Sequence, residues 1–248
     1  MPTDAADTQA ILARYPLQDR DASILDFNLR VLHWAERPDV PLLERLRYLC
    51  IVSSNLDEFF EVRAEPHLTA WRAGTDVQGG MRHLMAAAHA LVERQYAIYN
   101  EVLLPAMATR RMRIVSHIDR TEAQRKWVRE YFLREVKPLL VPVALDPAHP
   151  FPLVANKSLN FIVQLKGKDA FGRSNEIAIV KVPRVLPRVL RLPERVSAGD
   201  TLFVMLSSVI RAHLADLFPG RDVGDFAHVR VTRDSDLSVD EEEVKNLR

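Results

Sequence analysis

The chain has 248 residues, of which 48% are apolar and 27% are charged, the balance of a globular protein with a sizeable core. The formal net charge of +1 argues against a nucleic-acid partner, and a single cysteine, Cys50, excludes an intramolecular disulfide and a cysteine-rich metal centre. No signal-peptide pattern and no membrane-length apolar run occurs, so we expect a cytoplasmic protein, with peripheral membrane association left open.

The first part of the chain has the periodicity of long amphipathic helices. Residues 1–16 are polar and are expected to form a weakly ordered lead-in. A first helix is predicted from residue 17 to about Arg37, because Pro38 ends the pattern. Its expected inward-facing residues are Leu25, Leu29, Val31 and Leu32.

A second helix is predicted from Pro41 to about Glu65, with Asp39 as its cap and Pro66 as its end or a kink. Cys50 lies within this run and is expected to be a buried, unreactive thiol. One apolar row of this helix contains Leu42, Leu46, Leu49, Leu56 and Phe60, and a second contains Ile51, Val52, Phe59 and Val62.

Asn55 lies three or four positions from Ile51, Val52 and Phe59, which places an amide within the second apolar row. A buried amide costs free energy unless its donors and acceptors are met. Asn55 is therefore either hydrogen-bonded to another helix or in contact with a ligand, since an amide matches the amino and ring-nitrogen edge of adenine. Periodicity alone leaves both interpretations open.

A third helix is predicted after the glycine-containing connector at residues 73–80, giving an antiparallel three-helix bundle over residues 17–112. Its expected inner face comprises Met81, Leu84, Met85, Ala88, Leu91, Val92, Gln95, Ile98 and Val102. The basic run at residues 110–113 is taken as the domain boundary.

Residues 113–248 have the mixed pattern of an incomplete α+β domain. Thr121 opens a capping-box helix that ends at Pro138, and a second helix is predicted over residues 201–217. Strands are predicted at residues 159–165, 177–182 and 226–232, whereas three prolines exclude a helix over residues 183–193. An acidic helix is predicted from Val239 onward.

Motifs for self-contained catalysis are missing from the sequence. The eight histidines are scattered, and none stands in an H-E-x-x-H arrangement that would indicate a metal site. No G-x-x-x-x-G-K-[ST] loop and no G-x-S-x-G turn occurs. We therefore assign no catalytic residue and no metal ligand to this chain.

Several separated segments resemble one family. FNLRVL at residues 27–32, PLLERLRYL at 41–49 and SSNLDEFF at 53–60 are similar to the N-terminal helical domain of bacterial polyphosphate kinases of the histidine-using type. DPAHPFP at 146–152, NKSLNF at 156–161 and RDSDL at 233–237 are similar to the head domain of that family. The departures are Ile24 and the VRAEPHL segment at residues 62–68.

The resemblance implies a function that this chain would share with further domains. Family members reversibly transfer the terminal phosphate of ATP to inorganic polyphosphate through a phosphohistidine in C-terminal catalytic domains. We therefore expect a chain truncated within the head domain and inactive alone, with the histidine and the Mg²⁺ ligands outside it. The implied partners are ATP or ADP, polyphosphate, the chain's own catalytic domains and further copies of itself, joined through the head domain.

The same resemblance assigns a nucleotide contact to Asn55, with the helical domain covering the adenine of ATP. Asp57 and Glu58 would repel a triphosphate, and are expected to pair with Arg45, Arg63 or an adjacent helix.

The second candidate site is a basic series. Arg184, Arg188, Arg191 and Arg195 are candidate contacts for the polyanion polyphosphate, because guanidinium groups suit phosphate oxygens. The alternative for this series is a solvated loop or a contact to another subunit.

A different class of function is a non-catalytic dimerisation module, for which residues 177–180 would supply an apolar strand. A helical nucleic-acid binder is a weaker alternative, because the net charge is close to zero.

Overall fold

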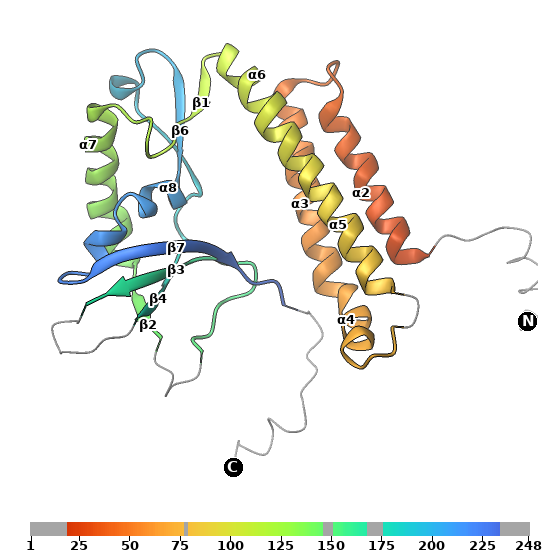
Figure 1. Ribbon diagram of the computed structural model, residues 1–248. Helices are drawn as coiled ribbons and strands as arrows, with labels where there is room; N and C mark the ends of the chain where they lie inside the picture. The colour runs from red at the N-terminus through yellow and green to blue at the C-terminus, as the bar shows by residue number, and fades with distance from the viewer. Residues whose placement is uncertain (1–18, 77–78, 146–150, 168–175, 234–248) are drawn as a thin grey trace, which may run out of the picture. The chain divides into compact units, whose positions relative to one another are not determined.

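The structure is a computed structural model that describes residues 19–76, 79–145, 151–167 and 176–233. These residues form two units, a helical unit that ends at Leu103 and a second unit from Leu104 to Arg233 (Figure 1). The predicted lead-in and the predicted acidic helix after Val239 lie outside the described residues. The predicted boundary at residue 112 stays a prediction.

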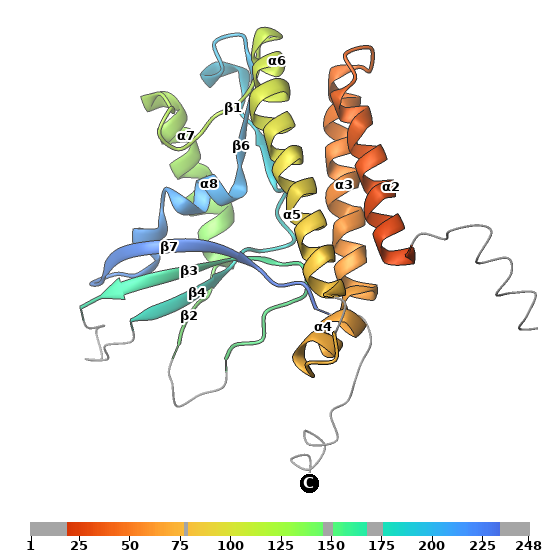
Figure 2. The ribbon, with the colours of Figure 1, turned by 45° about the vertical axis from the view of Figure 1, so that its right-hand side comes forward.

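The helical unit contains the expected antiparallel bundle, whose long helices lie side by side in Figures 1 and 2. Its elements are α2 (Arg20–Glu36), α3 (Leu42–Val62), the short α4 (Ala64–Arg72), α5 (Gly80–Ala97) and the π-helical turn η1 (Ile98–Leu103). The predicted bundle is therefore confirmed, with α4 as an addition between the second and third long helices.

The buried side of α2 differs from the prediction at two positions. The buried residues Leu25, Asn28, Leu32 and Ala35 recur at the spacing of one helix face. Leu29 is 39% exposed, because it follows Asn28 by one residue and so lies about 100° around the helix. The buried row of α2 thus contains an amide where the sequence suggested only apolar side chains.

Buried residues of the other two long helices complete the bundle core. They are Leu42, Leu49, Val52, Leu56 and Phe59 from α3, and Leu84, Ala88, Leu91 and Gln95 from α5. Val102 was predicted to face inward but is exposed, and Ile51 and Val62, from the second apolar row of the predicted helix, are exposed as well. The expectation for Cys50 was also wrong, because its thiol is exposed.

The ends of the helices are set by local chemistry. Asp19 caps α2 by accepting from the backbone N–H groups of Asp21 and Ala22. The predicted cap of α3 is wrong: Asp39 accepts from the guanidinium of Arg37, and Pro41 occupies the N-cap position. Helix α3 ends at Val62, so Pro66 falls in the first turn of α4, where its missing N–H leaves no bond unmade.

The second unit begins with α6 (Leu104–Thr109) and contains two sheets. Its strands are β1 (Met112–Ile114), β2 (Pro142–Ala144), β3 (Leu159–Lys166), β4 (Ile177–Lys181), β5 (Val189–Arg191), β6 (Thr201–Met205) and β7 (Asp222–Arg230). Its helical segments are α7 (Glu122–Tyr131), η2 (Phe132–Val136), η3 (Lys137–Leu139), η4 (Glu194–Val196), α8 (Leu206–Arg211) and η5 (Leu214–Leu217).

The strand order is β1-β6-β5 in one sheet and β2-β4-β3-β7 in the other. Strands β1 and β6 run parallel, whereas β3 pairs antiparallel with both β4 and β7. The side chains of Phe132, Phe161, Val163, Val204 and Ile210 are fully buried in one core that both sheets and the helices share. The predicted mixed α and α+β architecture is confirmed.

Most predicted elements of this unit are present. Strands β3 and β4 match the predicted ranges, β7 begins a little earlier than expected, and the proline-rich stretch before residue 193 contains β5 and no helix. The capping box is also present: the Thr121 hydroxyl accepts from the Gln124 N–H, and the Gln124 side chain accepts from the Thr121 N–H.

One predicted helix of this unit is wrong. Residues 201–205 form β6 instead of the start of a helix, and the helical part is divided between α8 and η5. Leu202 and Val204 are buried while their neighbours are half-buried, which is the alternation of a strand. Partners on both sides, β1 and β5, stabilise the extended form of this segment.

Candidate functional site

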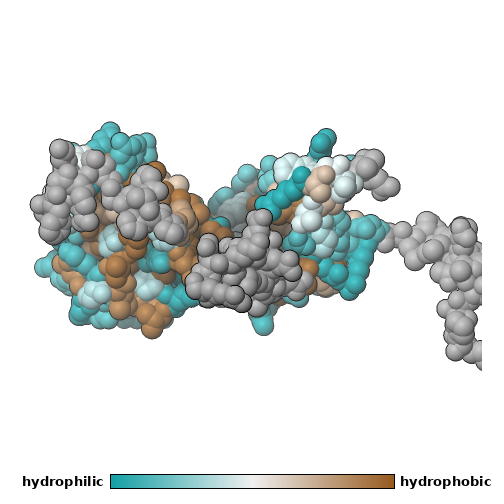
Figure 3. All heavy atoms as spheres, turned by 90° about the horizontal axis from the view of Figure 1, so that it is seen from below, coloured by the Kyte–Doolittle hydropathy of each residue, from teal (hydrophilic) through white to brown (hydrophobic). Residues whose placement is uncertain are grey.

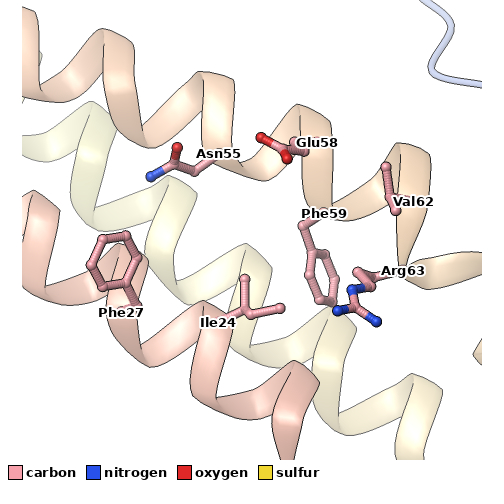
Figure 4. A pocket seen from close by; sticks show the side chains of 7 residues that line it. All are labelled: Ile24, Phe27, Asn55, Glu58, Phe59, Val62 and Arg63. Atoms are coloured by element: carbon pink, nitrogen blue, oxygen red, sulfur yellow. The ribbon is translucent and has the colours of Figure 1, made fainter.

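A pocket of about 280 Å³ lies between α2 and α3 in the helical unit. Its lining residues, drawn in Figure 4, are Ile24 and Phe27 from α2, with Asn55, Glu58, Phe59, Val62 and Arg63 from α3 and its C-terminal end. Asn55, which the sequence singled out, is therefore half-buried in the wall of a cavity.

Asn55 is held by a second amide that lies beneath it. Asn28, only 1% exposed, donates from Nδ2 to the carbonyl oxygen of Val52 at 3.0 Å. Its Oδ1 accepts from Asn55 Nδ2 at 3.1 Å. A backbone carbonyl can only accept, so the bond to Val52 fixes which end of the Asn28 amide points toward Asn55.

This chain of bonds fixes the orientation of Asn55 as well. Because Asn28 presents its oxygen, Asn55 must present its NH₂ group, which leaves the Asn55 carbonyl oxygen for another partner. Among the described residues, no hydrogen bond to that oxygen is found. The arrangement combines both interpretations of Asn55: one end is bonded to the neighbouring helix, and the other can meet a ligand.

The rest of the pocket wall is mainly apolar and aromatic. The Phe27 side chain is 52% exposed, and Figure 4 shows its ring on α2 across from Asn55 on α3. Phe59 is 2% exposed and lines the pocket together with Ile24 and Val62. An exposed ring next to an orienting amide suits a flat heteroaromatic group that stacks and hydrogen-bonds at its edge.

Two charged side chains border the pocket. Arg63 Nε lies 3.9 Å from Asp21 Oδ1, and the other Asp21 oxygen lies 2.8 Å from His67 Nε2. Glu58 supplies the negative charge of the lining. Arg45 was one of the predicted partners of Asp57 and Glu58, and this pairing is wrong. Arg45 is buried and donates to the backbone carbonyl oxygens of Ala35 and Glu36.

The four arginines of the predicted basic series lie in different segments and differ in burial. Arg184 is exposed and donates to the carbonyl oxygen of Asn156, and Arg191 is exposed on the edge strand β5. Arg188 is half-buried, and its Nη1 is buried without a hydrogen-bond partner, while Arg195 is exposed in η4. Polyphosphate contact by this series stays a prediction.

The described part of the chain contains neither a metal-binding cluster nor a membrane-spanning helix. Over residues 19–76, 79–145, 151–167 and 176–233, no group of three or more His, Cys, Asp or Glu side chains could hold a metal ion. In the same ranges, no helix combines the length and apolar composition needed to cross a membrane.

Two residues of the site, Phe27 and Asn28, were not predicted from the sequence. Phe27 and Asn28 fell within a segment used only for its resemblance, yet they form the wall and the support of the pocket. The signal for Asn28 was available, because it continues the 3-4-3 spacing of Leu25, Leu32 and Ala35. Nothing in the sequence pairs Asn28 with Asn55, which lies 27 positions away.

Comparison with known proteins follows the same division into two parts. Residues 17–115 match the polyphosphate kinase N-terminal domain, and residues 123–248 match the polyphosphate kinase middle domain. A polyphosphate kinase of Neisseria meningitidis serogroup A is 49% identical over 242 residues, which cover 92% of this chain and 35% of the relative. A polyphosphate kinase of Burkholderia vietnamiensis is 47% identical over 244 residues, covering 95% of this chain and 36% of the relative.

A solved structure agrees with these sequence relationships. The crystal structure of polyphosphate kinase from Porphyromonas gingivalis aligns with a TM-score of 0.77 and 31% sequence identity, over 91% of this chain and 34% of that chain. The chain thus spans about a third of the length of the relatives it matches. On the matched domains, the identity to relatives and the shared fold, this chain belongs to the polyphosphate kinase family.

Proposed function

We propose that this chain supplies one wall of the adenine site of an enzyme that transfers the terminal phosphate of ATP to polyphosphate. The observation that carries the proposal is the pocket lined by Asn55 and Phe27, where Asn28 orients the amide of Asn55 and the phenyl ring is exposed. The phosphohistidine and the Mg²⁺ ligands are proposed to come from other parts of the enzyme.

Asn55 recognises the base in this proposal. Its carbonyl oxygen would accept a hydrogen bond from the 6-amino group of adenine, and its second N–H would donate to a ring nitrogen. Guanine carries an oxygen at the position of that amino group, so it would place two acceptors against each other. The Asn28 support keeps Asn55 in this orientation before the base arrives.

The charges at the border set the direction of the phosphates. Glu58 disfavours a triphosphate beside it, whereas Arg63 is the one cation among the lining residues of this pocket. We therefore expect the base to lie at Asn55 and Phe27, with the phosphates directed away from Glu58. One wall provides only part of the contacts, so the affinity of this chain for ATP should be weak.

Calorimetric titration of the purified chain with ATP and with GTP tests the proposal. We expect weak binding of ATP, a further loss of affinity of about tenfold in Asn55→Ala, and little binding of GTP. Asn100→Ala is the matched control, because Asn100 is exposed and lies outside the pocket. Equal heats for the original chain and Asn55→Ala, or equal affinity for ATP and GTP, would contradict the proposed adenine contact.

The chain by itself is proposed to be catalytically inactive. Phosphoryl transfer needs positioned charge at the reacting phosphate, and in the described residues no metal-binding group occurs near the pocket. A coupled assay with ATP, Mg²⁺ and a polyphosphate primer should therefore show no polymer growth. Sustained turnover by the purified chain would overturn this part of the proposal.

A second candidate function, subunit association through the second unit, rests on its exposed apolar surface. Figure 3 shows a band of apolar residues on the face of this unit that is in view. Leu139, Val141 and Ile177 are 46%, 69% and 41% exposed, and β2 is an edge strand of its sheet. Residues 177–180, the strand first suggested for this role, belong to β4, which already pairs with β2 and β3.

Sedimentation distinguishes association from a monomer. If the β2 edge joins two copies, Val141→Asp should shift the chain toward the monomer, because a charge disfavours burial at an interface. Val185→Asp is the control, since Val185 is also exposed, at 80%, but precedes β5 in the other sheet. An unchanged sedimentation profile for both variants would exclude this edge as the interface.

A further inference from the structure

Arg120, in the loop between β1 and α7 of the second unit, is a buried cation with an incomplete set of partners. The residue is 3% exposed, and its Nε is buried without a hydrogen-bond partner. Among the described residues, no carboxylate forms an ion pair with it, and burial alone lowers its pKa from the ordinary value. Arginine stays charged in proteins, so this burial is costly unless an anion completes the site.

The partner that Arg120 does have connects it to α8. Its Nη2 donates to the hydroxyl oxygen of Ser208 at 2.7 Å. Arg211 lies three residues after Ser208, hence on the same side of that short helix, and its side chain is exposed. The Arg211 guanidinium also lies over the ring of Phe226, with its Cζ 5.0 Å from the ring centroid. Both arginines are therefore connected to α8, Arg120 through its bond to Ser208 and Arg211 as the last residue of that helix.

Two further basic side chains adjoin these arginines. Arg125, exposed on α7, donates from Nη1 to the backbone carbonyl oxygen of Arg120 at 2.6 Å. Burial lowers the pKa of His117, and the positive charges of Arg211 and Arg120 lower it further. We call these four residues, His117, Arg120, Arg125 and Arg211, the basic cluster.

Negative charge near the basic cluster is limited. Asp119 raises the pKa of His117, but this effect is smaller than those of the arginines, and its carboxylate also accepts from the Ser116 hydroxyl at 2.6 Å. In the part of the chain that the structure describes, none of the three arginines of the cluster forms an ion pair. The three arginines are therefore not neutralised by a direct ion pair with a described carboxylate.

We propose that the basic cluster is a phosphate-binding site on the second unit, with Arg211, Arg125 and His117 contacting the ligand and Arg120 supplying charge from beneath. A multiply charged phosphate matches several guanidinium groups better than one carboxylate does, and guanidinium N–H groups fit its oxygens in pairs. The same chemistry is offered by free orthophosphate and by one unit of a polyphosphate chain. The basic cluster belongs to the second unit and the Asn55 pocket to the helical unit, so this proposal goes beyond the proposed adenine contact.

The test is calorimetric titration of the purified 248-residue chain with orthophosphate and with tripolyphosphate. Arg211→Gln should weaken binding of the anion by about tenfold, the loss expected for one charge-assisted contact. Arg110→Gln is the control with the same change of charge, because Arg110 is exposed in the turn before β1. Tighter binding of tripolyphosphate would assign the site to a chain, and equal affinities would assign it to a single phosphate.

Three results would overturn the proposal. The first is that neither anion binds, and the second is that Arg211→Gln and Arg110→Gln weaken binding equally. The third is a dimer that Arg211→Gln dissociates while no anion binds, which would mean that an acidic segment of another copy faces the cluster. Asn55→Ala should leave tripolyphosphate binding unchanged, so failure here is distinguishable from failure of the adenine proposal.

Discussion

Replacing the buried amide of Asn28 by a carboxylate of the same shape tests the arrangement that holds Asn55. In Asn28→Asp the donor to the Val52 carbonyl at 3.0 Å is lost, while the acceptor for Asn55 is kept. No cavity forms, because the two side chains have nearly equal volume. The change therefore isolates the hydrogen bond and the charge.

The expected loss of stability follows from burial. The missing hydrogen bond costs about 0.5–1.5 kcal/mol, and a carboxylate at a position that is 1% exposed, facing a carbonyl oxygen, adds a desolvation penalty. We expect a total of about 2–4 kcal/mol at neutral pH. Asn100→Asp is the matched control at an exposed position, expected to change stability by less than about 0.5 kcal/mol.

The pH dependence has a definite sign. Burial raises the folded-state pKa of the introduced carboxyl above its unfolded value of about 3.9. Below the unfolded pKa the acid is protonated and can again donate to the Val52 carbonyl, so the variant should approach the stability of the original chain. Stability should then be lost as pH rises through the folded-state pKa.

Urea unfolding followed by tryptophan fluorescence measures this effect, because Trp34 lies on the same helix as Asn28. A loss below about 1 kcal/mol at neutral pH, or a loss that does not change with pH, would refute the proposed orientation of the two amides.

The remaining predictions concern single contacts and one thiol. Glu36→Gln should cost at most about 1 kcal/mol at neutral pH, because the pair with Arg94 is partly exposed. The hydrogen bonds from Arg94 lower the pKa of Glu36 below 4.5, so this difference should vanish as pH falls through the folded-state pKa, as urea midpoints across a pH series would show. Thr121→Ala should cost about 1 kcal/mol in urea unfolding, since it removes the capping box, and an unchanged midpoint would contradict that role. Phe132→Ala should cost about 3–5 kcal/mol, because the ring is fully buried and stacks on His213 at 4.5 Å between centroids; a loss near 1 kcal/mol would contradict its place in the core. Cys50 should react with a thiol reagent without denaturant, as absorbance of the released chromophore would show, whereas reaction only after unfolding would indicate a buried thiol.

The sequence was informative wherever local chemistry decides local structure. The apolar spacing around Leu25 and Leu32 predicted α2, and Thr121 with Gln124 predicted the start of α7. Asn55 was identified as an amide within an apolar row, and it does lie at a pocket. Whether it binds a nucleotide remains a proposal.

The errors occurred where a local pattern permits two structures. Residues 201–205 are apolar enough for either a helix or a strand, and only pairing with β1 and β5, which lie far along the chain, selects the strand. Similarly, Cys50 lies within the helical run and was expected to be buried, but it follows the buried Leu49 by one residue, lies about 100° around α3 and is exposed.

By itself, the sequence determined which segments are amphipathic, where several of them begin and which domain family they form. Tertiary structure alone decided that Asn28 and Asn55 bond to each other, and that Arg120 is buried beside Ser208 rather than solvated. The physical reason is that helix periodicity and capping depend on neighbours a few residues away, whereas the orientation of an amide and the burial of a charge depend on distant segments that only folding brings together.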